Sequence, residues 1–167
     1  CVCDSDAPKY LHFLYSSQET VNYRSNDDNR HDVFCAVDVA STEQLGRLDY
    51  LAEKVDFMVD HHGTGTPFAP CWVEPDASAC AELICKIYRK LVLEGSIIKD
   101  ADIARRLYAG ISADCGSFKY SNTTPETHML AASLIDDISK ANDGKETHSE
   151  IAAKLFDSNS KEDLTAA

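Results

Sequence analysis

Short apolar runs separated by polar turns dominate the first part of the chain and predict β-strands. The run at 33–37, Val-Phe-Cys-Ala-Val, is uninterrupted, which is typical of a strand covered on both faces. Further runs at 55–60 and 71–74 predict the next two strands. Between the first two runs, Ser41 and Gln44 have the spacing of a capping box and predict a helix. The predicted order is therefore strand, helix, strand, loop, strand.

The second part of the chain repeats apolar residues at the spacing of helices rather than strands. It predicts a helix at 78–94 and further helices that begin at typical start signals, namely Asp100, Thr124 and the capping box at Thr147. The stretch 110–121 breaks this periodicity and predicts an irregular segment. Together the elements predict an α/β fold class: a parallel β-sheet flanked by helices, followed by an α-helical C-terminal half.

Composition and charge narrow the classes of function. The chain has 167 residues and a formal charge of −12, which argues against an extended basic surface for duplex nucleic acid. This charge does not exclude a short anionic substrate, because bound divalent cations would invert the local field. No apolar run approaches the roughly 18–20 residues that span a bilayer, so no membrane partner is expected. The cysteines form no Cys-x-x-Cys pair and are expected to be reduced thiols, which favours a cytoplasmic location.

Acidic and histidine side chains follow the predicted strands at the points where the strands end. Asp38 closes the first strand, Asp60-His61-His62 closes the second, and Asp114 lies in the irregular segment. Because the carboxyl ends of parallel strands share one edge of a sheet, Asp38 and Asp60 are expected about 5 Å apart there. Converging carboxylates repel unless a cation neutralises them, and a mixed carboxylate and imidazole set suits Mn²⁺, Fe²⁺ or Zn²⁺. A single such aspartate is often only a turn former, so it is the combination that favours a metal centre.

Several segments resemble the motifs of one family, the DHH phosphoesterase superfamily. Residues 59–62, Val-Asp-His-His, resemble its naming motif, and 36–38, Ala-Val-Asp, resemble its second motif. The segment 110–125 is similar to its fourth motif, and 76–84 resembles the helix start that follows the histidines. Within the superfamily the chain looks similar above all to bacterial oligoribonucleases and 3′-phosphoadenosine 5′-phosphate phosphatases, whose second domain is of the DHHA1 type.

The resemblance implies a site with two Mn²⁺ ions, with Mg²⁺ or Co²⁺ as alternatives. Asp38 would bridge the ions, His61 and Asp114 would bind one of them, and Asp60 would orient His61. His62 would face the substrate phosphate as a donor or an acid, and the ions would generate a hydroxide and clamp the transferring phosphoryl oxygens. Weaker candidates for phosphate contacts, for which plain turn chemistry is an equal explanation, are Gly63, Ser117, Ser121 and Thr123.

The resemblance implies an enzyme that hydrolyses a short oligonucleotide, a nucleoside bisphosphate, or both. The enzyme is expected to be cytoplasmic and able to form a homodimer. A cyclic-dinucleotide phosphodiesterase and an inorganic pyrophosphatase are alternatives within the superfamily. A catalytically inert domain that keeps the fold for regulation or interaction is the alternative of another class.

One departure from the family pattern bears on these alternatives. The family's first motif, a His-x-x-x-Asp-x-Asp cluster that supplies further ligands, is expected to precede this sequence. Asp4 and Asp6 reproduce part of its spacing, but no histidine lies upstream of them. Residues 1–145 are therefore expected to form a partial DHH domain without its first motif, and 146–167 the start of a linker helix toward a DHHA1-type domain. Such a fragment is expected to be inactive by itself.

Overall fold

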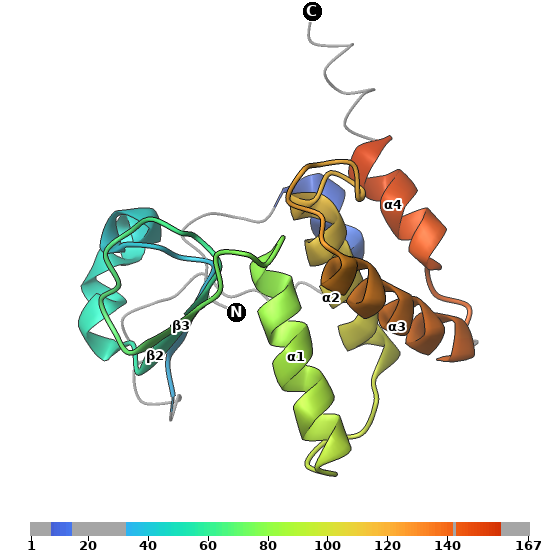
Figure 1. Cartoon of the computed structure of the whole chain (residues 1–167), viewed down its shortest axis with the longest axis horizontal. Helices are drawn as coiled ribbons and strands as arrows, with labels where there is room; N and C mark the ends of the chain where they lie inside the picture. The colour runs from blue at the N-terminus through green and yellow to red at the C-terminus, as the bar shows by residue number, and fades with distance from the viewer. Residues whose placement is uncertain (1–7, 15–32, 142, 158–167) are drawn as a thin grey trace, which may run out of the picture. The chain divides into compact units, whose positions relative to one another are not determined.

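The computed structural model describes residues 8–14, 33–141 and 143–157, which divide into two compact units, 1–75 and 76–167 (Figure 1). The expectations for Asp4, Asp6 and the tail after 157 lie outside the described residues. The predicted division at residue 145 concerns the whole protein and stays a prediction. Within the ranges described, no helix has the length and apolar character needed to cross a membrane.

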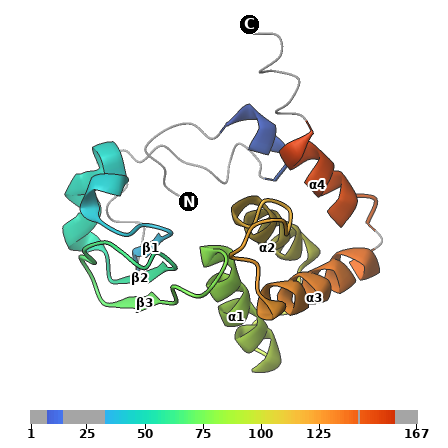
Figure 2. The ribbon, with the colours of Figure 1, turned by 45° about the horizontal axis from the view of Figure 1, so that its top comes forward.

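The first unit contains a sheet of three parallel strands, β1 (Cys35–Val37), β2 (Phe57–Asp60) and β3 (Cys71–Val73). They lie side by side in the order β1-β2-β3 (Figure 2), with Val37 opposite Val59 and Val59 opposite Trp72. The parallel sheet predicted from the sequence is thereby confirmed. The unit also includes a short 3₁₀ helix, η1 (Lys9–Leu14).

The burial of β1 differs from the prediction of a strand covered on both faces. Ala36 is buried, whereas Cys35 and Val37 are exposed. Successive side chains of a strand point to opposite faces, so one face of β1 is covered and the other is open. β2 is more deeply placed, since Met58, Val59 and Asp60 are all buried.

The helix between β1 and β2 forms, but not as the capping box predicts. It is a 3₁₀ helix, η3 (Thr42–Lys54), which is interrupted at Gly46, where φ is +56°. The Ser41 side chain makes no cap bond, and Gln44 Oε1 instead accepts a hydrogen bond from the Ala40 N–H at 2.5 Å. A left-handed glycine interrupts the regular helical hydrogen bonding, which the amphipathic pattern alone does not reveal.

The described residues of the second unit form four α-helices: α1 (Cys80–Leu93), α2 (Ala101–Asp114), α3 (Pro125–Ala141) and α4 (His148–Phe156), seen in Figure 1. Each helix contributes a side chain with 0 % exposure to the core, namely Leu83, Ile111, Leu134 and Ile151. The predicted break at 110 is wrong, because α2 continues through Gly110 to Asp114. A Cβ at Gly110 would lie only 2.8 Å from the Cβ of Ala81, so glycine serves close packing of α2 on α1.

The predicted start signals of α2, α3 and α4 are confirmed. Asp100 Oδ1 accepts the N–H of Asp102 at 2.7 Å at the start of α2. Thr124 Oγ1 accepts the N–H of Thr127 at 3.2 Å at the start of α3. Thr147 and Glu150 form a reciprocal capping box at the start of α4. These bonds satisfy N–H groups that have no partner within the helix.

The described cysteines are free thiols, as the sequence predicts. Cys35 and Cys71 are exposed, while Cys80, Cys85 and Cys115 are buried. Burial raises the pKa of the Cys85 and Cys115 thiols. Buried thiols with raised pKa values are poor nucleophiles and poor metal ligands, which agrees with a packing role.

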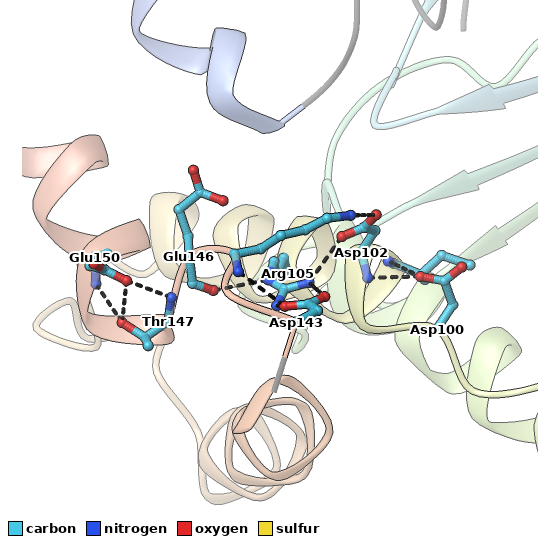
Figure 3. Close-up of polar contacts among 9 residues, drawn as sticks. Asp100, Asp102, Arg105, Asp143, Glu146, Thr147 and Glu150 are labelled. Carbon is cyan, nitrogen blue, oxygen red and sulfur yellow. Dashed lines mark hydrogen bonds and ion pairs between the residues drawn. The ribbon is translucent and has the colours of Figure 1, made fainter. Parts of the chain in front are cut away.

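A buried arginine ties α2 to the segment that leads into α4 (Figure 3). Arg105 Nε donates to the carbonyl oxygen of Glu146 at 2.9 Å, and its terminal nitrogens contact both carboxylate oxygens of Asp143 at 2.6 and 3.1 Å. A terminal nitrogen of Arg105 also donates to Asp102 at 2.9 Å, and Lys145 Nζ contacts the other oxygen of Asp102 at 2.5 Å. This two-pronged pairing fixes the geometry of the connection to α4.

Replacing the buried arginine is expected to destabilise the protein. Arg105→Met removes the guanidinium from the Asp143 carboxylate, to which the Lys145 N–H still donates, and removes the Arg105 donor from the Glu146 carbonyl. We therefore expect the free energy of unfolding to fall by about 1–3 kcal/mol in urea denaturation. The matched control is Arg106→Met on the exposed side of the same helix, with an expected change below about 0.5 kcal/mol. Equal losses in both variants would contradict a special role for Arg105.

Acid is expected to weaken the same network. Hydrogen bonds from Lys145, Arg105 and Lys154 hold the pKa values of Asp102, Asp143 and Glu146, respectively, below their ordinary range. Groups with lowered folded-state pKa values stabilise the fold above their unfolded pKa and lose that contribution as pH falls. We therefore expect the urea midpoint to decline between about pH 5 and pH 3, and to decline less steeply in Arg105→Met. Identical profiles for the two proteins would refute this assignment.

Candidate metal centre

Backbone pairing between β1 and β2 brings the acidic and histidine residues to one edge of the sheet. The N–H of Asp38 donates to the carbonyl oxygen of Val59 at 3.0 Å, so the pairing continues one residue past the end of β1. Asp38 therefore lies beside Asp60, the last residue of β2, and beside the two histidines that follow. This is the shared carboxyl edge that the sequence predicts.

Ligand atoms of Asp38, His61 and His62 converge at this edge. One atom from each residue can be chosen so that all of them lie within 4.8 Å of one another. His61 Nε2 is 3.5 Å and His62 Nδ1 is 3.9 Å from Asp38 Oδ1, and the imidazole ring centroids are 4.8 Å apart. A carboxylate with imidazoles is a donor set for a divalent transition metal, and the residues present fit such an ion.

Asp60 organises both histidines from a buried position. Its side chain is 4 % exposed, and its Oδ1 accepts the backbone N–H of His61 at 2.8 Å. The same oxygen lies 2.7 Å from Nδ1 of the His62 ring. That Asp60 orients the His61 ring stays a prediction, and the structure adds a contact of the Asp60 carboxylate with the His62 ring. With the carboxylate as acceptor, Nδ1 of His62 is the donor of this hydrogen bond.

The backbone of Asp38 is strained. Its φ is +62°, in the left-handed region that few residues other than glycine adopt, although aspartate and asparagine tolerate it best. Such a conformation costs on the order of 1 kcal/mol and persists when surrounding contacts enforce it. Here the hydrogen bond to Val59 holds the residue in place. Strain at a residue that faces two histidines is consistent with a functional role.

The loop after the histidines packs closely on the residues that follow Asp38. Gly65 has a φ of +148°, and a Cβ there would lie 2.5 Å from the carbonyl oxygen of Ala40. Asp60, His62, Gly63 and Gly65 are among the residues that line a cavity of about 170 Å³ next to the site. The structure thus places Gly63, a weak candidate for phosphate contact, in the wall of a cavity that His62 also lines.

The remaining candidates belong to the second unit. Asp114 is the last residue of α2, and its side chain is exposed. Ser117 lies in a left-handed turn with a φ of +56°, Ser121 is exposed, and Thr123 Oγ1 is buried with no hydrogen-bond partner among the described residues. Their placement beside Asp38 and the histidines stays a prediction, as do their roles.

Comparison with known proteins gives the site a family context. No protein-family model matches the chain. Its fold is similar to that of a putative family II inorganic pyrophosphatase from Methanococcus jannaschii, with a TM-score of 0.55 and 24 % identity over 73 % of this chain and 40 % of the other.

Comparison with curated proteins finds relatives by sequence. The chain is 30 % identical over 126 residues to the "Bifunctional oligoribonuclease and PAP phosphatase NrnA" of Bacillus subtilis, covering 75 % of this chain and 39 % of that protein. The protein of the same name from Thermus thermophilus is 30 % identical over 132 residues, covering 78 % and 39 %. The chain belongs to the DHH phosphoesterase superfamily. It spans about two fifths of the length of these relatives.

Membership in the DHH superfamily confirms the recognition made from the short motifs. Which side chains bind metal stays a prediction, supported for Asp38 and His61 by the measured convergence of ligand atoms. The sequence assigns His62 to the substrate and not to the metal, and the structure places it within the same cluster of ligand atoms.

Close packing of the histidine loop yields a test of the local structure. Gly65→Ala is expected to lower the free energy of unfolding by about 1–3 kcal/mol, because the added methyl group meets Ala40 and the φ is strained. Gly63→Ala is the matched control, since its Cβ would lie at an ordinary 3.5 Å from the Cβ of Pro75. Urea denaturation compares the two variants, and an equal effect would show that the close approach at Gly65 is unimportant.

Proposed function

We propose that this chain supplies part of the active site of a metal-dependent phosphoesterase. The observation that carries the proposal is the convergence of Asp38, His61 and His62 within 4.8 Å at the carboxyl edge of the parallel sheet. A structural role explains this arrangement poorly, because it combines a strained aspartate, a buried aspartate and adjacent imidazoles at one edge of the sheet. Backbone strain such as that of Asp38 occurs preferentially at active sites and ligand-binding sites.

Each residue has a distinct part in the proposed site. Asp38 and His61 are the metal ligands of this unit, and Asp114 is the ligand proposed from the other unit. Asp60 accepts from Nδ1 of His62 and orients the ring, and the form of the ring that also carries a proton on Nε2 is the proposed donor or acid toward the substrate phosphate. When bound, divalent cations would lower the pKa of coordinated water and neutralise charge on the phosphoryl oxygens.

The proposed ion is Mn²⁺, with Mg²⁺ or Co²⁺ as substitutes, and the proposed substrate is a short oligonucleotide or 3′-phosphoadenosine 5′-phosphate. The carboxylate and imidazole donors support the choice of ion. The names of the relatives from two bacteria support the choice of substrate. The formal charge of −12 supports recognition of phosphate through cations rather than through a basic surface. A homodimer and a cytoplasmic location stay predictions.

The proposal predicts a metal-dependent hydrolase in which Asp38 is essential. In the full-length protein, Asp38→Asn is expected to reduce Mn²⁺-stimulated hydrolysis of a dinucleotide and of 3′-phosphoadenosine 5′-phosphate by about 100-fold or more. Asparagine tolerates the left-handed φ of this position, so the loss reports the missing charge rather than a disturbed backbone. Release of mononucleotide and of inorganic phosphate measures the two reactions.

Asp49→Asn, an exposed aspartate of η3, is the control and is expected to keep full activity. Pyrophosphate and a cyclic dinucleotide are assayed in parallel, and preferential hydrolysis of either would replace the proposed substrate with that one. Failure of Mn²⁺ to stimulate any of these reactions, or full activity in Asp38→Asn, would overturn the enzymatic proposal and favour an inert domain.

A further inference from the structure

A cluster of buried polar side chains lies behind Asp114, where the start of α1, the end of α2 and the start of α3 meet. Its members include Ser78, Glu82 and Thr127, which are 0 %, 1 % and 0 % exposed. None of them takes part in the proposed metal centre. Glu82 is the most unusual of the group, because a carboxyl group is rarely buried so completely without a cation.

Hydrogen bonds join these residues into one chain that links α1 to α3. The Ser78 hydroxyl donates to Glu82 Oε1 at 2.5 Å. The Thr127 hydroxyl donates to Ser78 Oγ at 3.3 Å, and Thr127 is itself bonded to Thr124, the cap of α3. Ser78 is therefore the node of the cluster, and Glu82 fixes the direction in which its hydroxyl points.

Asn122 connects this node to Asp114. Its side-chain nitrogen donates to the backbone oxygen of Ser78 at 3.1 Å and to the backbone oxygen of Asp114 at 3.3 Å. The Asp114 carbonyl is one of the last in α2, which have no partner within the helix. Asn122 therefore fastens the end of α2 to the residues before α1.

The backbone after Asp114 explains why such a fastening is needed. Gly116, Ser117 and Phe118 all adopt left-handed φ values, of +54°, +56° and +64°. Consecutive left-handed residues other than glycine are strained and need external contacts to persist. The bridge from Asn122 closes this turn against a rigid support.

A contribution to stability does not explain why the buried position 82 holds a glutamate. Its second oxygen, Oε2, is buried and has no hydrogen-bond partner among the described residues. An unsatisfied buried carboxyl oxygen lowers stability, and an apolar residue of similar volume would avoid that loss. The presence of a carboxyl group here is explained if its hydrogen bond to Ser78 helps to hold the end of α2 at Asp114.

We propose that Glu82, acting through Ser78 and Asn122, is a positioning residue that holds the end of α2 so that Asp114 can serve as a metal ligand. This inference rests on the proposed function, since it assumes that Asp114 binds the ion. Partners behind metal ligands commonly change metal affinity without touching the ion.

The test measures Mn²⁺ binding to the full-length protein by isothermal titration calorimetry, together with the Mn²⁺ concentration for half-maximal activity. Glu82→Ala and Asn122→Ala are expected to raise both values by about 10–100-fold, with kcat at saturating Mn²⁺ largely retained. Glu82→Gln keeps an oxygen that accepts from Ser78 and is expected to restore affinity close to the unmodified protein. Asn122 is exposed, so its variant tests the bridge without disturbing the core.

Asp137→Asn is the matched control for loss of a buried carboxylate. Asp137 lies in α3 with a side chain 5 % exposed and pairs with Arg89 and Lys99, about 15 Å along the helix from Thr127 at a rise of about 1.5 Å per residue. It is expected to lower the melting temperature but to leave Mn²⁺ affinity unchanged. A shift of Mn²⁺ affinity equal to that of Glu82→Ala would overturn the positioning role.

Asp114→Ala, measured in parallel, separates the two ways in which the inference can fail. If Asp114→Ala leaves Mn²⁺ affinity unchanged, the ligand role in the proposed function is wrong, and the positioning role falls with it. If Asp114→Ala weakens binding but Glu82→Ala and Asn122→Ala do not, the positioning role alone is refuted. If Asn122→Ala has no further effect in the Asp114→Ala background, the two residues act through one interaction, which supports the proposal.

Discussion

The parallel pairing of β1 with β2 is the interaction on which the candidate metal centre depends. Val37 lies opposite Val59, and the N–H of Asp38 extends the pairing by its bond to the Val59 carbonyl. This register places Asp38 beside residues more than twenty positions away in the sequence. A shift by one residue would turn the side chains to the opposite face of the sheet and separate Asp38 from the histidines. Register therefore decides whether the site exists.

The candidate metal centre concentrates acidic side chains in a chain that is already acidic. The chain carries a formal charge of −12, yet it places Asp38 and Asp60 at the same edge of the sheet, at the ends of two neighbouring strands. Asp60 is satisfied by the His61 N–H and the His62 ring, whereas Asp38 is about half exposed and faces both imidazoles. Asp114 shows a related arrangement in the second unit, with an exposed carboxylate at the end of a helix and a buried polar cluster behind it. In each unit an exposed carboxylate is thus accompanied by a buried carboxyl group that is hydrogen-bonded to nearby residues.

Local patterns predicted much of the fold. The caps at Asp100, Thr124 and Thr147 were predictable because each bonds to a backbone N–H two or three residues away. The break at Gly110 was wrongly predicted because the absent Cβ serves contact with Ala81 on another helix. Likewise, the capping box at Ser41 fails because Gln44 bonds instead to Ala40, beside the closely packed Gly65 loop. The structure at such positions depends on contacts with residues that a local sequence pattern does not include.

The sequence by itself determined the fold class, the family and the set of acidic and histidine residues at the strand ends. Periodicity predicts the fold class because it reflects backbone geometry within a few residues, and the family was indicated by the resemblance of the short motifs. Only the tertiary structure decided that Asp60 contacts the ring of His62, that Asp38 is left-handed, and that Glu82 is buried behind Asp114's helix end. These features arise from strand register and helix packing between distant segments, where side-chain direction and burial are set by partners that the linear order does not specify.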